Sequence, residues 1–249
     1  HFNFTAHQDK ATPSLIGDVP EGVMLNQSPI FLGGQGGLVG PTRIAYGTVV
    51  AAGTVCRRDV LERGKLVFGQ TGHRMKEVPY DTRVYGAIDR ICQNNFIYLG
   101  NLHALDAWYR HARPRLMPDD VYTRACLEGA RKRIASMADE RIKRLTQLAD
   151  KLTLSLSLSG REGKVATGAP FDHQRLFVER WPTLAPNLEL PVSDEARSPG
   201  ETFQSILDNQ KDNDYIDIIQ NLSPGDCAAG IAWLQGIVDS ITSVWGDIH

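Results

Sequence analysis

One aliphatic residue returns at every sixth position between residues 32 and 56 of the 249-residue chain. These positions are Leu32, Leu38, Ile44, Val50 and Cys56. Small residues follow the first four of them at a distance of four, namely Gly36, Thr42, Thr48 and Thr54. An α-helix repeats about every 3.6 residues and a strand about every two, so neither alone produces this spacing.

The six-residue period is typical of a coil made of three short strands, with about eighteen residues in each turn. Each strand points one aliphatic side chain inward, and stacked parallel coils bury these side chains in a continuous column. Small residues fit the tight corners, where glycine adopts backbone conformations that a Cβ hinders. The alternative is a glycine-rich antiparallel β domain in which the spacing is accidental.

From about residue 85 the hydrophobic positions take a helical spacing. We predict helices over residues 89–113, 119–152, 203–221 and 224–245. Pro114 is expected to interrupt the first of them. Ser223 is a predicted N-cap of the last, with Pro224 at the first helical position and Asp226 three residues after the cap. The stretch TLSLSLSG, residues 153–160, alternates between leucine and serine and indicates a short strand.

The chain therefore divides into four parts. These are β coils over residues 1–72, an extension and helical region over 73–153, an irregular connection over 154–200, and C-terminal helices over 201–249.

Composition and charge exclude several classes of protein. The formal net charge of -2 gives no reason to expect binding to nucleic acid or to a membrane surface. We expect no apolar run to reach the eighteen or so residues of a membrane span. The four cysteines are far apart and include no CxxC pair, which argues against a zinc ribbon or a disulfide framework and suits a reducing cytoplasm. The first residue is histidine, so we expect the sequence to be part of a longer chain.

Two stretches carry a resemblance to a known family. They are IGDV, residues 16–19, and FLGGQGGLVGPTRIAYGTVVAAGTVCRRDV, residues 31–60. They resemble the last coils of the left-handed β-helix acyltransferases, most closely the bifunctional N-acetylglucosamine-1-phosphate uridyltransferase/glucosamine-1-phosphate acetyltransferase family. FNFTAHQDK, residues 2–10, is more weakly similar. The likeness covers about the first sixty residues and stops there.

The resemblance implies a set of binding residues. Asn3, Phe4, Gly34, Ala51 and Ala52 stand where the family contacts acetyl-coenzyme A, with a serine in the family at the position of Gly34. Each has a structural alternative, because asparagine satisfies turn backbones and corners need small residues.

Other parts of the family's site are placed only approximately or are absent. Lys10 aligns with a family lysine and is the substrate-binding candidate. The family's catalytic histidine, and the residues that hold its sugar phosphate, fall before position 1, so no catalytic residue is named. His103 and His111 lie eight apart without a third ligand in register, so no metal site is predicted.

The resulting prediction is an α+β chain, with the end of a left-handed parallel β-helix followed by a mainly helical domain. We expect the C-terminal part of a cytoplasmic sugar-nucleotide transferase that forms a homotrimer. It would use acetyl-CoA to acylate an amino-sugar phosphate, or accompany an upstream nucleotidyltransferase domain that needs Mg²⁺. The alternative is a non-catalytic trimerisation scaffold with a partner-binding helical module. Whether the chain is itself an enzyme stays open at this point.

Overall fold

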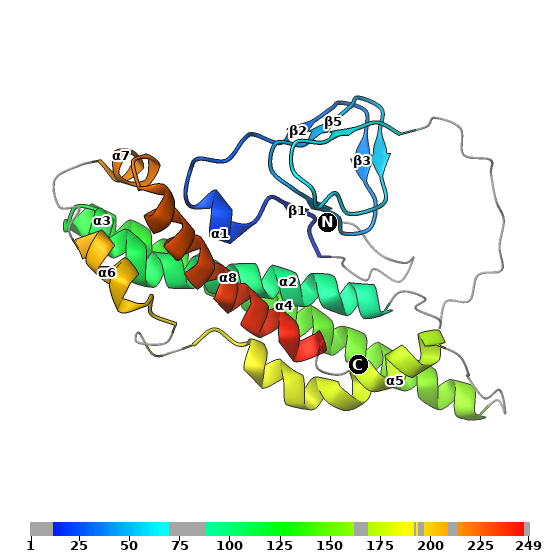
Figure 1. Ribbon diagram of the computed structural model, residues 1–249. Coiled ribbons are helices and arrows are strands. Elements are labelled where there is room, and N and C mark those ends of the chain that lie inside the picture. The colour runs from blue at the N-terminus through cyan, green and yellow to red at the C-terminus, as the bar shows by residue number, and fades with distance from the viewer. Residues whose placement is uncertain are drawn as a thin grey trace.

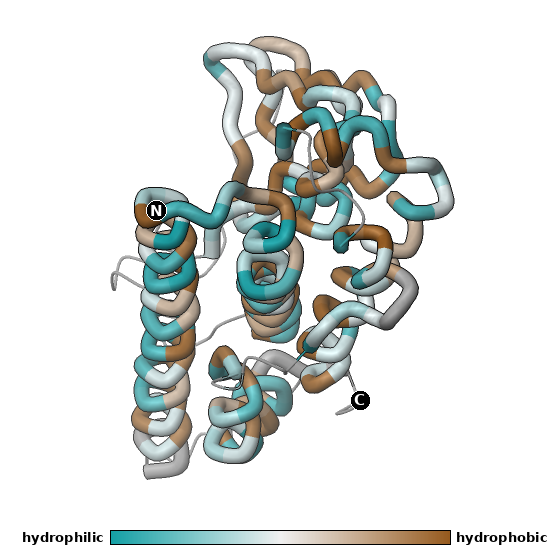
Figure 2. The backbone as a smooth tube through the Cα atoms, turned by 90° about the vertical axis from the view of Figure 1, so that its left-hand side faces the viewer, coloured by the Kyte–Doolittle hydropathy of each residue, from teal (hydrophilic) through white to brown (hydrophobic). Residues whose placement is uncertain are grey.

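The chain folds into a mostly helical structure with short parallel strands in its N-terminal region (Figure 1). The computed structural model describes residues 12–69, 88–161, 169–191, 193, 197–208 and 214–246. Three predicted site residues, Asn3, Phe4 and Lys10, lie outside these described residues. The strands lie at one end of the molecule, above the helices in both views (Figures 1 and 2).

Seven strands of two residues each build three small parallel sheets in residues 12–69, which we call the three-sheet region. They are β1 (Leu15–Ile16), β2 (Phe31–Leu32), β3 (Gly37–Leu38), β4 (Arg43–Ile44), β5 (Val49–Val50), β6 (Val55–Cys56) and β7 (Leu66–Val67). The sheets are β1-β4, β2-β5-β7 and β3-β6. Phe31 pairs with Val49 and Gly37 with Val55, so each partner lies eighteen residues further along the chain. Consecutive strands therefore belong to different sheets, and the antiparallel alternative is wrong.

The predicted inward positions are buried in one turn of the repeat. The second residue of β4, β5 and β6 is buried, and these residues are Ile44, Val50 and Cys56. Thr42, Thr48 and Thr54 are also buried, as expected for small residues at the corners. The column is not covered at its first turn, where Leu32 is 42% exposed.

A short helix, α1 (Val19–Gly22), interrupts the six-residue repeat between β1 and β2. The side chain of Asp18 caps it by accepting from the backbone N–H of Glu21 (3.0 Å). The insertion joins the two halves of the molecule, because the N–H of Val19 donates to Oδ1 of Asn101 (2.8 Å). Met24, just after α1, is fully buried among the helices.

The described residues of the helical part form four longer helices and several short ones. The bounds are α2 (Ile88–Ala107), a π-helical turn η1 (Trp108–Ala112), α3 (Arg113–Leu116), α4 (Val121–Arg161), α5 (Ala169–Leu184), the 3₁₀ turn η2 (Ala185–Leu188), α6 (Glu201–Asp208), α7 (Tyr215–Gln220) and α8 (Pro224–Gly246). Helix α2 packs against both α4 and α8. Along α4, hydrophobic and hydrophilic residues are interleaved (Figure 2), and its buried residues include Ile134, Leu145 and Leu152.

The predicted helix starts are confirmed to within two residues, but α4 ends nine residues beyond its predicted end, and the helix predicted over 203–221 is described as α6 and α7 with undescribed residues between them. The predicted interruption at Pro114 is wrong. Helix α8 begins at Pro224, and the N–H of Asp226 donates to Oγ of Ser223 (3.2 Å), which is the predicted cap. At Pro114 the chain continues as helix after a π turn. The N–H of Arg113 donates to the carbonyl of Trp108, and Pro114 lies in the first turn of α3, where its missing N–H is tolerated.

Three expectations differ from the structure. TLSLSLSG is not a strand, because α4 continues through it to Arg161, and residues 154–200 are not an irregular connection, because they also contain α5 and η2. The stretch Pro224–Trp245 of α8 is long and apolar enough, by length and composition, to cross a membrane, which differs from the expectation that no run reaches this length. In the fold, Leu234 and Ile241 of this stretch are buried in the helical core.

Candidate functional site

Two stacked corners of the three-sheet region contain predicted coenzyme-binding residues. The corner after β2, residues 33–36, lies on the corner after β5, residues 51–54. The N–H of Gly53 donates to the carbonyl of Gly34 (2.8 Å), and the N–H of Gly33 donates to the carbonyl of Val50 (2.8 Å). We call these residues the stacked corner.

The stacked corner requires glycine at position 33 but has room for a side chain at position 34. A Cβ on Gly33 would lie 2.3 Å from the backbone N of Ala52, which no real side chain tolerates. A Cβ on Gly34 would meet nothing within 4 Å. Gly34 and Ala52 are both exposed, so the corner presents backbone groups to solvent with little side-chain cover.

The structure thus brings together three of the predicted binding residues, Gly34, Ala51 and Ala52. Their proximity follows from the eighteen-residue offset between paired strands. Asn3, Phe4 and Lys10 cannot be placed beside them, because they lie outside the described residues. No residue in the ranges 33–36 and 51–54 carries a titratable side chain, so the corner offers hydrogen bonds and space but no acid or base.

An open hollow of about 550 Å³ lies beside the stacked corner, at the end of the inward column. Its apolar wall is formed largely by Ile16, Leu32 and Leu38, and Thr12 also lines it. Its volume falls within the range of roughly 300–1,000 Å³ that is usual for small-molecule sites. Sequence reasoning missed this hollow, because the insertion that carries α1 displaces Ile16 from the six-residue period.

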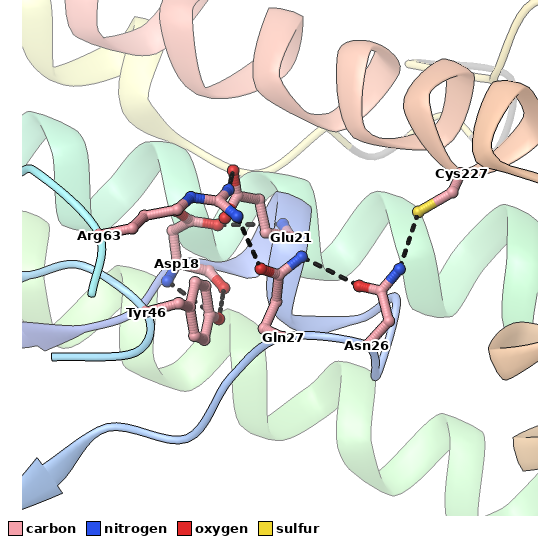
Figure 3. Close-up of polar contacts among 7 residues, drawn as sticks. All are labelled: Asp18, Glu21, Asn26, Gln27, Tyr46, Arg63 and Cys227. Atoms are coloured by element: carbon pink, nitrogen blue, oxygen red, sulfur yellow. Dashed lines mark hydrogen bonds and ion pairs between the residues drawn. The ribbon is translucent and has the colours of Figure 1, made fainter.

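Polar side chains gather instead on the side of the three-sheet region that faces the helices. Tyr46 donates through its hydroxyl to the carbonyl of Asp18 (2.7 Å), and burial raises the pKa of this phenol. Figure 3 shows the neighbouring chain of contacts, in which Arg63 pairs with Glu21.

The same chain of contacts reaches helix α8. Arg63 donates to Gln27 (2.9 Å), Gln27 donates to Asn26 (2.9 Å), and Asn26 donates to Sγ of Cys227 (3.4 Å) (Figure 3). Because every link is satisfied by another protein group, this network is a connection between the two halves of the molecule.

A second polar group lies where the β1-β4 sheet meets α2. Asp59 accepts from Nε of Arg43 (2.9 Å) and from its backbone N–H (3.0 Å), and Arg90 lies 3.8 Å from the same carboxylate. A cavity of about 190 Å³ between Arg43, Asn101 and Gln235 separates the sheet from α2 and α8. This is less than the usual volume of a small-molecule site.

Within the helices, buried polar side chains hold the segment that follows η2. His103 donates through Nε2 to the carbonyl of Leu188 (2.9 Å) and accepts from Arg197 at Nδ1. Arg110 donates to the carbonyls of Pro191 (3.0 Å) and Ser193 (3.1 Å).

These contacts give the two helical histidines structural roles. His103 is fully occupied by the contacts just described, and the ring of His111 contacts Trp233 edge-on. Within the described part of the chain, no three His, Cys, Asp or Glu side chains lie close enough together to hold a metal ion.

Comparison with known proteins returned no family model, no curated protein and no solved structure that matches this chain.

Proposed function

We propose that the three-sheet region is the end of a left-handed parallel β-helix, and that the chain is the C-terminal part of a sugar-nucleotide transferase of the acetyltransferase class. The observation that carries the proposal is the stacked corner, together with the parallel pairing at an eighteen-residue offset. In this proposal the corner forms one wall of the acetyl-CoA groove, and the acceptor is an amino-sugar phosphate.

The chemical argument rests on access to the backbone. The pantetheine arm of acetyl-CoA is long and thin and carries two amide groups, so it needs exposed peptide groups with little side-chain cover. Gly34 and Ala52 provide such a surface on two adjoining turns. The described corner residues supply no acid or base, so the proton transfer that acylation of an amine requires must come from elsewhere in the assembled enzyme.

Coenzyme binding is tested by calorimetric titration of the chain with acetyl-CoA. The variant Ala52→Trp fills the groove while leaving the buried column of Val50 and Cys56 intact, so binding should fall at least tenfold with an unchanged melting temperature. The matched control is Val39→Trp, an exposed apolar position at a different corner, which should bind like the parent. Equal binding by both variants, or no binding by the parent, would remove the acetyltransferase proposal.

A second function, the non-catalytic trimerisation scaffold, is favoured by one specific observation. The outward side chains of β2, β5 and β7 form a row in register, with Phe31 61%, Val49 40% and Leu66 62% exposed. Phe68 lies just beyond and is 76% exposed. With about 150–250 Å² for each aromatic side chain, the four residues expose on the order of 400 Å² of apolar surface.

This area fits an interface between copies of the chain. A standard interface covers about 800 Å² on each partner, of which somewhat more than half is apolar. We propose that three copies meet through this row. Light scattering should give a trimer for the parent and a smaller species for Leu66→Glu, whereas Val121→Glu, exposed on α4, should leave the trimer intact. A monomeric parent would contradict the trimer and leave coenzyme binding as a separate question.

A further inference from the structure

We draw no further inference here: the strongest candidate, the cavity of about 190 Å³ between the β1-β4 sheet and helices α2 and α8, points to no ligand, because it is smaller than a usual small-molecule site and the side chains of Arg43 and Asn101 on its wall already bond to Asp59 and to main-chain groups.

Discussion

Replacing Gly33 by alanine should be one of the most damaging single-methyl changes in the three-sheet region. An added Cβ would lie 2.3 Å from N of Ala52, 2.6 Å from C of Ala51 and 2.7 Å from Cα of Ala52. All three are backbone atoms, so no side chain can rotate away. The two stacked turns must therefore separate, which weakens the bond from the N–H of Gly33 to the carbonyl of Val50.

The magnitude follows from two opposing effects. Overpacking in a closely packed region costs about 1–3 kcal/mol, and a clash against backbone belongs at the upper end. Alanine also restricts the unfolded chain, which stabilises the folded state by about 0.4–1 kcal/mol. We expect a net loss of about 2 kcal/mol for Gly33→Ala. Gly34→Ala lacks the clash and keeps the second effect, so it should be neutral or stabilising by up to about 1 kcal/mol.

Urea unfolding followed by far-ultraviolet circular dichroism, with amide hydrogen exchange of the three-sheet region, measures both variants. Because about 1 kcal/mol shifts the melting temperature of a chain of this size by roughly 2–4 °C, the two variants should also differ by about 4–12 °C in thermal melting. The neighbouring pair repeats the test, since a Cβ on Gly36 would lie 2.4 Å from the carbonyl oxygen of Thr54 and one on Gly37 meets nothing. Equal stability of Gly33→Ala and Gly34→Ala would refute the stacking of these corners.

Three further outcomes are expected. Gln35 has a positive φ of 57°, so Gln35→Gly should raise the free energy of unfolding by about 0.5–1 kcal/mol. Gly53 has a φ of 74° and open space around its Cβ, so Gly53→Ala should lower the free energy of unfolding by about 1 kcal/mol. Urea titrations that give both changes the same sign would contradict this. Arg110→Met should cost about 3 kcal/mol in chemical denaturation, because it removes the 2.9 Å partner of the buried Asp106 carboxylate and leaves only Arg131, 3.7 Å away. A loss below about 1 kcal/mol would show that the pair contributes little. Burial raises the pKa of the Cys92 thiol well above its ordinary value, so the folded state keeps the proton after the unfolded state has lost it, and stability should fall as the pH rises above about 9; in pH-dependent melting, Cys92→Ala should fall less steeply than the parent.

The strands of the three-sheet region were predictable because their spacing is set by local geometry. A strand of two residues and a corner of four repeat every six positions. The six-residue spacing alone therefore predicts that Val50 and Cys56 are buried, as they are. The pairing of β1 with β4 was not predictable, because α1 lengthens that turn to 28 residues. The six-residue spacing does not show where the chain returns to the repeat after the α1 insertion.

The error at residues 153–160 has a similar physical origin. The six alternating leucine and serine residues at 154–159 would set the leucines on one face of a strand, but a helix that is already formed extends at little cost. Leu152 is buried and continues the stripe of Leu145, whereas Leu154 is 61% exposed, as a helical position on the outer side can be. Alternation over so few residues does not outweigh thirty preceding helical residues.

The candidate site was partly predictable for the same reason as the fold. Gly34 and Ala52 are eighteen residues apart, so the predicted turn of eighteen residues is enough to stack one above the other. The contacts of His103 and Arg110 were not predictable, because they reach main-chain carbonyls more than eighty residues away, and a carbonyl carries no signal of residue type.

The position of Met24 has a consequence for how the protein is made. The Met24 methyl group packs against Gly230 of α8 so closely that a Cβ on Gly230 would lie 2.6 Å from it, and the ring of Phe203 is equally near. The packing around Met24 is therefore complete only once α8 is in place. Ribosomes add roughly 5–20 residues per second. The α1 segment therefore leaves the ribosome roughly 10–40 seconds before its partner helix exists. During that interval Met24 lacks the helix it packs against, and the final closure of this core must follow synthesis of α8.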